Sequence, residues 1–172
     1  MKILLCGFMG SGKTTIFKRL MENSPKVLGF DLDNLVQEKI SLDGEDLGQA
    51  IERIGFEEFR LVESHLLTEK LKEQGDCLIS LGGGSLSPEI LELISKDKGA
   101  KLVWVKTDFE TCWERISGST ERPLVKKGKE ALKQLFEERE AIYCSANIAL
   151  EIEAQQRVSN FEELDDECQV KA

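Results

Sequence analysis

The stretch G-F-M-G-S-G-K-T at residues 7–14 decides the fold of this chain. It matches the pattern G-x-x-x-x-G-K-[S/T] of a phosphate-binding loop, or P-loop. The glycines of this pattern let backbone N–H groups curl around phosphate oxygens, and the following helix adds its positive N-terminal end. The lysine, Lys13, then reaches the β- and γ-phosphates, and the hydroxyl of Thr14 binds Mg²⁺. A chance match is expected in only roughly one chain of this length in a hundred.

The residues around this stretch have the composition that a phosphate-binding loop requires. Residues 2–6 form a short apolar run that predicts a strand, and residues 14–21 are good helix formers. The order is therefore strand, loop and helix, which is the context that supports the motif. We expect the nucleotide phosphates to be bound by Gly10, Ser11, Gly12, Lys13, Thr14 and Thr15.

The rest of the chain alternates between strand and helix patterns. Further strands are predicted at 27–30, 77–80, 101–105 and 148–152, and residues 35–71 are helical with breaks near 41–44 and at Gly55. Such alternation implies a parallel sheet. We therefore predict an α/β fold, a three-layer α/β/α sandwich with a central parallel sheet of about five strands.

Length and composition limit the classes of protein that fit. A chain of 172 residues is expected to form one domain, residues 1–172. Its net charge of -9 disfavours nucleic acid and anionic membrane as partners. No apolar run approaches the roughly 18 residues of a membrane span, and residues 1–7 do not resemble a secretory signal. Five scattered cysteines indicate free thiols, so we expect a cytoplasmic protein.

Two carboxylates, Asp31 and Asp33, follow the second predicted strand. In an extended segment residues two apart point the same way, here toward the mouth of the sheet, where α/β proteins bind ligands. One carboxylate would then serve Mg²⁺ and the other an acceptor hydroxyl. The alternative is that both merely cap the next helix, as aspartate often does.

Three consecutive glycines, residues 82–84, follow the strand predicted at 77–80. One glycine would suffice for a turn, and each costs backbone entropy on folding. The triplet favours a backbone that lies against a ligand, with a flexible loop as the alternative.

Arg115, Arg122 and Arg139 flank a polar segment bounded by glycines, and we predict that residues 117–128 form a mobile lid. In an acidic protein these arginines would supply positive charge to a nucleotide and an acceptor. A solvated surface is the alternative, above all for Arg139, which is followed by a glutamate.

Together these motifs resemble the shikimate kinase family over nearly the whole chain, up to about Ile152. The resemblance rests on the P-loop at 7–15, Asp-Leu-Asp at 31–33, Phe-Arg-x-x-Glu at 59–63 and the glycine triplet at 82–84. It implies a P-loop fold similar to nucleoside monophosphate kinases. It also implies transfer of the ATP γ-phosphoryl group, with Mg²⁺, to the 3-hydroxyl of shikimate, a step toward chorismate and the aromatic amino acids.

The resemblance also implies a role for each matched residue. The implied catalytic residues are Lys13, Asp33 and Arg122, with Asp33 orienting the hydroxyl and accepting its proton. Thr14 and Asp31 would hold Mg²⁺. Arg115 would bind ATP on its adenine side, and Arg122 would do so from the lid. The residues implied to bind shikimate are Asp33, Arg60, Gly82, Gly83, Gly84 and Arg139, the two arginines at its carboxylate.

Some positions depart from the family pattern. Gly55 is followed by Phe56 rather than glutamate, and Ile51 stands where an aromatic residue is common. A helical segment at about 34–72 would bind the acceptor, and the stretch between Asp33 and Arg60 is a few residues longer than usual. These changes concern the shape of the acceptor pocket, and the acidic tail after Glu153 departs most. By analogy with the class we expect a monomer.

Three other functions stay open on the sequence. A gluconate-type or nucleoside monophosphate kinase would share the P-loop but need different acceptor residues. A switch GTPase would need an Asn-Lys-x-Asp stretch to bind guanine, and the sequence has none. A non-catalytic nucleotide-binding module is disfavoured because every matched catalytic position is filled.

Overall fold

A five-stranded sheet forms the centre of the protein. The computed structural model describes residues 1–118 and 123–170. The strands are β1 (Lys2–Cys6), β2 (Leu28–Asp31), β3 (Cys77–Ser80), β4 (Ala100–Val105) and β5 (Ile148–Leu150). Their order is β2-β3-β1-β4-β5, and every pairing is parallel. The predicted α/β fold with about five parallel strands is confirmed.

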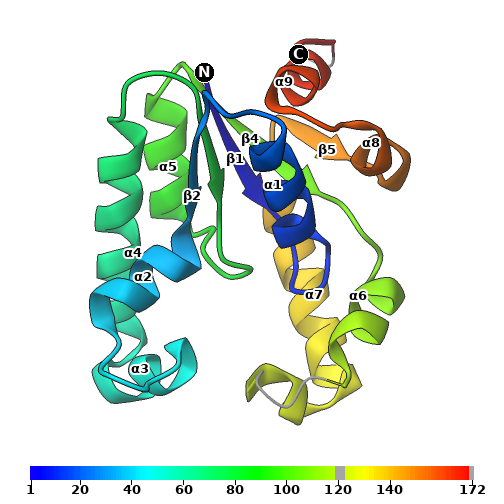
Figure 1. Cartoon of the computed structure of the whole chain (residues 1–172). Coiled ribbons are helices and arrows are strands. Elements are labelled where there is room, and N and C mark those ends of the chain that lie inside the picture. Colours follow the sequence, from blue (N-terminus) through cyan, green and yellow to red (C-terminus); the bar gives the residue numbers. More distant parts are fainter. Residues whose placement is uncertain (119–122, 171–172) are drawn as a thin grey trace.

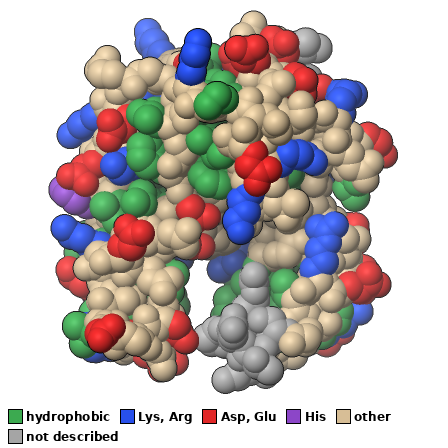
Figure 2. Space-filling model, viewed as in Figure 1, with side chains coloured by type: hydrophobic (Ala, Val, Ile, Leu, Met, Phe, Trp, Pro, Cys, Tyr) green, Lys and Arg blue, Asp and Glu red, His purple; other side chains and the backbone are tan. Residues whose placement is uncertain are grey.

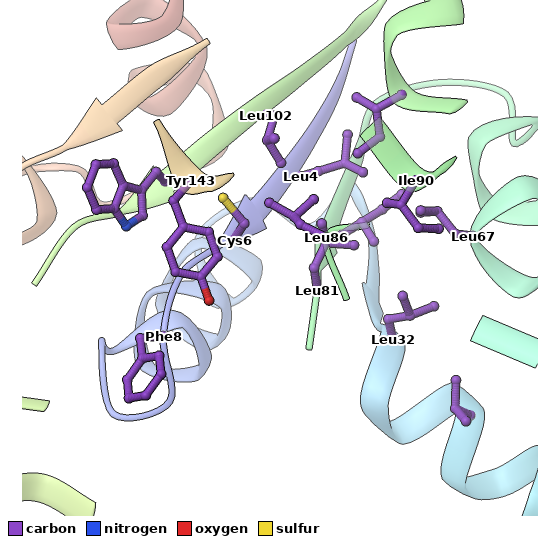
Figure 3. Packing of buried hydrophobic residues seen from close by; sticks show 14 of the residues in the cluster. Leu4, Cys6, Phe8, Leu32, Leu67, Leu81, Leu86, Ile90, Leu102 and Tyr143 are labelled. Carbon is purple, nitrogen blue, oxygen red and sulfur yellow. The ribbon is translucent and has the colours of Figure 1, made fainter. Parts of the chain in front are cut away.

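Alternate residues of β1 face two separate hydrophobic cores, because side chains along a strand point to opposite faces. Leu4 and Cys6 belong to one core, and Figure 3 shows them next to Leu102 and Tyr143. Ile3 and Leu5 belong to the other core. The central strand is therefore buried on both faces, as expected for a parallel sheet covered by helices on both sides.

Helices supply the two outer layers (Figure 1). One core is closed by residues of α1 (Lys13–Glu22), α8 (Ile152–Arg157) and α9 (Phe161–Val170). The other core is closed by residues of α2 (Leu32–Ile40), α4 (Phe56–Leu71), α5 (Pro88–Lys96), α6 (Phe109–Ile116) and α7 (Lys129–Tyr143). The short helix α3 (Leu47–Ile54) and a 3₁₀ turn, η1 (Pro123–Lys127), lie at the end of the molecule where the strands point.

Side-chain caps fix where several helices begin. Asp31 accepts a hydrogen bond from the Asn34 amide at 3.2 Å and so caps α2. Asp46 and Gln49 form a capping box at the start of α3. Asp108 accepts from the Thr111 amide at 2.9 Å and so caps α6. Each cap satisfies a backbone donor that a helix start leaves open.

The acidic tail packs as part of the fold. Residues 148–152 were expected to be a strand, but β5 ends at Leu150 and Ile152 begins α8. The tail then buries its apolar side chains, including Phe161, Leu164 and Cys168, against the α1 face of the sheet. The acidic side chains between them lie outside this core, with Asp165 and Glu167 partly buried, so a strongly acidic sequence still closes one core.

All five cysteines are free, as expected, although Cys144 is exposed whereas the other four are buried. Within the described ranges, no helix has both the length and the apolar character needed to cross a bilayer.

Leu164→Ala should destabilise the whole protein, because Leu164 of α9 is fully buried. A buried leucine truncated to alanine loses about 2–5 kcal/mol of stability. Urea unfolding should show a fall of this size, whereas Asp166→Ala on the exposed side of the same helix should change stability by no more than about 0.5 kcal/mol. An unchanged midpoint for Leu164→Ala would mean that the tail is only loosely attached.

Candidate active site

The phosphate-binding loop leaves the carboxyl end of β1 and enters α1. Gly7, Gly10 and Gly12 have backbone φ values of 145°, 81° and 100°, which residues other than glycine rarely adopt. A Cβ atom on Gly10 would also lie 2.7 Å from the Cys112 carbonyl oxygen. All three glycines are therefore required by backbone conformation, and Gly7 and Gly10 are also required by close packing.

A cleft of about 600 Å³ lies over this loop and is lined by its predicted phosphate-binding residues. Lys13 begins α1, and its ammonium group donates to the carbonyls of Gly7 at 2.6 Å and Phe8 at 3.1 Å. The predicted phosphate ligands all line this cleft: Gly10, Ser11, Gly12, Lys13, Thr14 and Thr15. The hydroxyl of Ser11 is buried and has no hydrogen-bond partner among the described residues.

The same cleft is also lined by Ile152, Gln155 and Gln156 of α8, to which the sequence did not point. Arg115 of α6, which was expected on the adenine side of ATP, lines it as well. Arg115 donates to the Gly10 carbonyl at 2.9 Å, which places its guanidinium beside the phosphate-binding loop. This wall is suited to the nucleoside half of a nucleotide, and Gln155 itself is held by hydrogen bonds to the carbonyls of Lys106 and Leu150.

Asp31 and Asp33 line the cleft, but the extended segment proposed for them is wrong. Helix α2 begins at Leu32, so Asp31 is its N-cap and Asp33 lies in its first turn. The capping alternative therefore holds for Asp31, which still faces the cleft. The two carboxylates share the cleft because the strand ends and the helix begins at its edge.

The pKa of the Asp33 carboxyl group is strongly perturbed. Burial raises the pKa of Asp33 to about 6, and repulsion from Asp31 and Glu63 adds to this effect. Attraction to Lys13 and Arg60 opposes it. A carboxyl group with a pKa close to neutral can both accept and release a proton under physiological conditions.

The glycine triplet is needed because side chains approach the backbone closely. A Cβ atom on Gly82 would lie 2.4 Å from the Asp33 carboxylate, and one on Gly84 would lie 2.7 Å from an Arg139 guanidinium nitrogen. Gly83 has more room, since its nearest neighbour would be the Met9 amide at 3.4 Å. The triplet is thus part of a packed wall, which argues against the flexible-loop alternative.

Arg60 and Arg139 converge at Gly84. The Cβ position of Gly84 would be 3.0 Å from an Arg60 nitrogen and 2.7 Å from an Arg139 nitrogen. Arg60 forms an ion pair with Glu63, which is 1% exposed, whereas no carboxylate of the described residues pairs with Arg139. Burial lowers the pKa of Arg139, as does the nearby charge of Arg60. Two guanidinium groups and one carboxylate leave a net positive charge here, suited to an anion.

A second cleft, of about 510 Å³, contains these arginines. Its other walls include Ile51, Phe56 and Phe59, so it has an apolar side opposite the charged one. Figure 2 shows the molecule hollowed by a notch that opens at its lower edge. Both clefts are lined by Met9, Asp33 and Gly83, which means that they meet at Asp33. A group could pass directly from a ligand in one cleft to a ligand in the other.

Residues 119–122 of the predicted lid, which include Arg122, lie outside the described residues. The predicted lid and the predicted role of Arg122 are therefore untested. The η1 turn that follows contributes Leu124 and Lys127 to the second cleft.

The donors expected for Mg²⁺ fit its chemistry. The Thr14 hydroxyl and the Asp31 carboxylate both face the first cleft. Across the described part of the chain there is no cluster of three or more metal-binding His, Cys, Asp or Glu side chains. Mg²⁺ bound with a nucleotide usually takes only one or two carboxylates and completes its shell with phosphates and water.

Comparison with known proteins gives consistent matches. A family model described as shikimate kinase matches residues 9–169. Shikimate kinase of Lactococcus lactis subsp. lactis is 36% identical over 156 residues, 88% of each chain.

Solved structures agree with these sequence matches. The crystal structure of shikimate kinase from Aquifex aeolicus superposes with a TM-score of 0.74 at 32% identity, over 99% of this chain and 95% of that one. The Acinetobacter baumannii enzyme in complex with shikimate gives a TM-score of 0.74 at 24% identity, over 98% and 89% of the two chains. At that identity it supports the fold alone.

Asp33→Asn should stabilise the protein at pH 8. The folded-state pKa is about 6, above the ordinary value of 3.8, so ionising Asp33 destabilises the fold. This penalty is absent below about pH 3.8 and complete above about pH 6. Removing the charge should therefore add on the order of 3 kcal/mol to the free energy of unfolding at pH 8 and much less at pH 4. Urea unfolding of the variant and the wild type at both pH values tests this. A variant that is no more stable than the wild type at pH 8 would contradict the assigned burial.

Proposed function

This chain belongs to the shikimate kinase family, and we propose that it transfers the γ-phosphoryl group of ATP to the 3-hydroxyl of shikimate through the two joined clefts. The observation that carries the acceptor assignment is the convergence of Arg60 and Arg139 at Gly84. Guanidinium groups bind carboxylates through charge-assisted, often bidentate hydrogen bonds. A small monocarboxylic acid with ring hydroxyls fits a site that has these arginines on one side and an apolar wall on the other.

ATP occupies the first cleft in this proposal. The P-loop backbone holds its phosphates, and Lys13 turns from the loop carbonyls toward the β- and γ-phosphates. The base lies between Arg115 and the α8 residues Ile152, Gln155 and Gln156. The buried Ser11 hydroxyl, which has no partner in the described structure, is available to the phosphate side.

Shikimate occupies the second cleft with its carboxylate on Arg60 and Arg139. Its ring then lies near Ile51, Phe56 and the glycine triplet, and a hydroxyl reaches Asp33 where the clefts meet. Asp33 accepts a hydrogen bond from this hydroxyl and orients its oxygen toward the γ-phosphorus. As the new O–P bond forms, Asp33 takes the hydroxyl proton, the bond from the γ-phosphorus to the β,γ-bridging oxygen breaks, and ADP leaves. The raised pKa suits this role, because a base works best when its pKa lies near the working pH.

Phosphoryl transfer depends mainly on positioning and on neutralising charge. Mg²⁺, held by Thr14 and Asp31, would supply charge neutralisation at the phosphates when bound. Lys13 performs the same task from the P-loop side. We assign Arg122 to the γ-phosphate on the evidence of the sequence motif alone.

The binding partners of the protein follow from this activity. Its partners would be the small molecules ATP and shikimate, with neither nucleic acid nor membrane involved. By analogy with the class we propose that it works as a monomer in the cytoplasm.

Lys13→Ala should lower kcat by at least about 10²- to 10³-fold, the usual loss when a group that stabilises the transition state is removed. Steady-state kinetics with ATP and shikimate measure this effect, and circular dichroism checks the fold. Lys18→Ala, an exposed position on the same helix, is the matched control and should keep normal kcat. A folded Lys13→Ala protein with near-normal kcat would refute the role of Lys13.

Arg60→Lys and Arg139→Lys should each raise the KM for shikimate by roughly 10- to 150-fold, because a lysine cannot reproduce the planar two-pronged contact. The KM for ATP should change less than about twofold, since both arginines face the second cleft. Arg53→Lys is the control: Arg53 of α3 pairs with Glu45, which precedes this helix, and Arg53 does not line the cleft. Normal shikimate saturation in both cleft variants would overturn the assignment of the acceptor.

A further inference from the structure

Glu63 is a buried carboxylate held by donors from two different elements. It lies on α4, is 1% exposed, and lines the second cleft. Its Oε2 accepts a hydrogen bond from Arg60 on the same helix, and its Oε1 accepts one from the Ser85 hydroxyl. Because each oxygen has its own donor, both donors together fix the orientation of the carboxylate.

Ser85 is well placed to be the fixed member of this group. It follows the glycine triplet directly, and its side chain is 1% exposed. Its backbone amide donates to the Gly82 carbonyl at 3.1 Å, which closes the turn and sets the position of the Cβ atom. A buried hydroxyl requires a hydrogen-bond partner, and Glu63 provides a charged one.

Arg60, in contrast, has a long side chain that is 37% exposed. Among the described residues its only ion pair is with Glu63. One of its nitrogens points to Gly84, where it meets Arg139. Repulsion between the two guanidinium groups disfavours this position, so the orientation of Glu63 must hold Arg60 in place against it.

We propose that Ser85 is a positioning residue for the acceptor carboxylate and acts through Glu63 on Arg60. Without the hydroxyl, Oε1 of Glu63 is buried with no donor, and the carboxylate turns to satisfy both oxygens from Arg60. Arg60 then leaves the point at Gly84 where it meets Arg139. This inference rests on the proposed function, because it assigns Ser85 to the binding of shikimate.

Ser85→Ala should raise the KM for shikimate by roughly 3- to 10-fold, the range expected when a hydrogen bond to a charged group is lost and partly replaced. The KM for ATP should stay within about twofold, and kcat should change little because the phosphates and Asp33 are not moved. Ser87→Ala is the matched control. Ser87 caps α5 two residues away and does not line the second cleft, so its loss should lower Tm without raising the KM for shikimate.

A double-mutant cycle shows whether Ser85 acts through Arg60. In the Arg60→Ala background, Ser85→Ala should have almost no further effect on the KM for shikimate, because the residue that it positions is gone. Equal fold-changes in both backgrounds would overturn the proposal, as would a normal KM in Ser85→Ala alone. Should Ser85→Ala not fold, Ser85→Gly serves in the same cycle.

The proposed function and this inference fail in different ways. A wild-type protein that does not phosphorylate shikimate overturns the proposed function. A wild-type protein that does, together with a Ser85→Ala variant that saturates normally, overturns only the role of Ser85.

Discussion

The close packing of the phosphate-binding loop is the constraint on which the rest of the structure depends. The loop must turn out of a buried strand and into a helix while its backbone amides stay open to a ligand. Gly7 and Gly10 make this possible, since Cβ atoms there would lie 2.8 Å and 2.7 Å from the carbonyl oxygens of Val105 and Cys112. The loop is thereby pressed against the end of β4 and against α6, and the central strand order places both clefts at this end of the sheet.

Charge in the second cleft is arranged for binding at the expense of stability. Arg139 is partly buried and has no carboxylate partner among the described residues, and Asp33 is an acid whose pKa is raised to about 6. Each arrangement is unfavourable in the empty protein, and perturbed ionisable groups of this kind cluster at functional sites. A ligand that brings a carboxylate to the arginines and a hydroxyl to Asp33 relieves both. The same glycine triplet gives room for all three side chains.

The sequence predicted the fold and most of the cleft residues, because glycines, P-loop spacing and apolar strands are local signals. It could not predict why Asp33 faces the cleft, since the change from β2 to α2 at Leu32 depends on a cap. The spacing of Arg60 and Glu63 equally fits a solvated surface pair, and only the burial of Glu63 distinguishes the two. The α8 wall was missed because its position depends on how the acidic tail packs far along the chain.

The central claim is that the two clefts form one phosphoryl-transfer site for a carboxylate-bearing hydroxy acid. The most direct measurement is ADP release from ATP and Mg²⁺ by the purified protein, coupled to NADH oxidation, with shikimate, gluconate and nucleoside monophosphates offered separately. The account predicts that, of these acceptors, only shikimate leads to ADP release, with one ADP formed for each shikimate consumed. Turnover with gluconate or a nucleoside monophosphate, and none with shikimate, would contradict it.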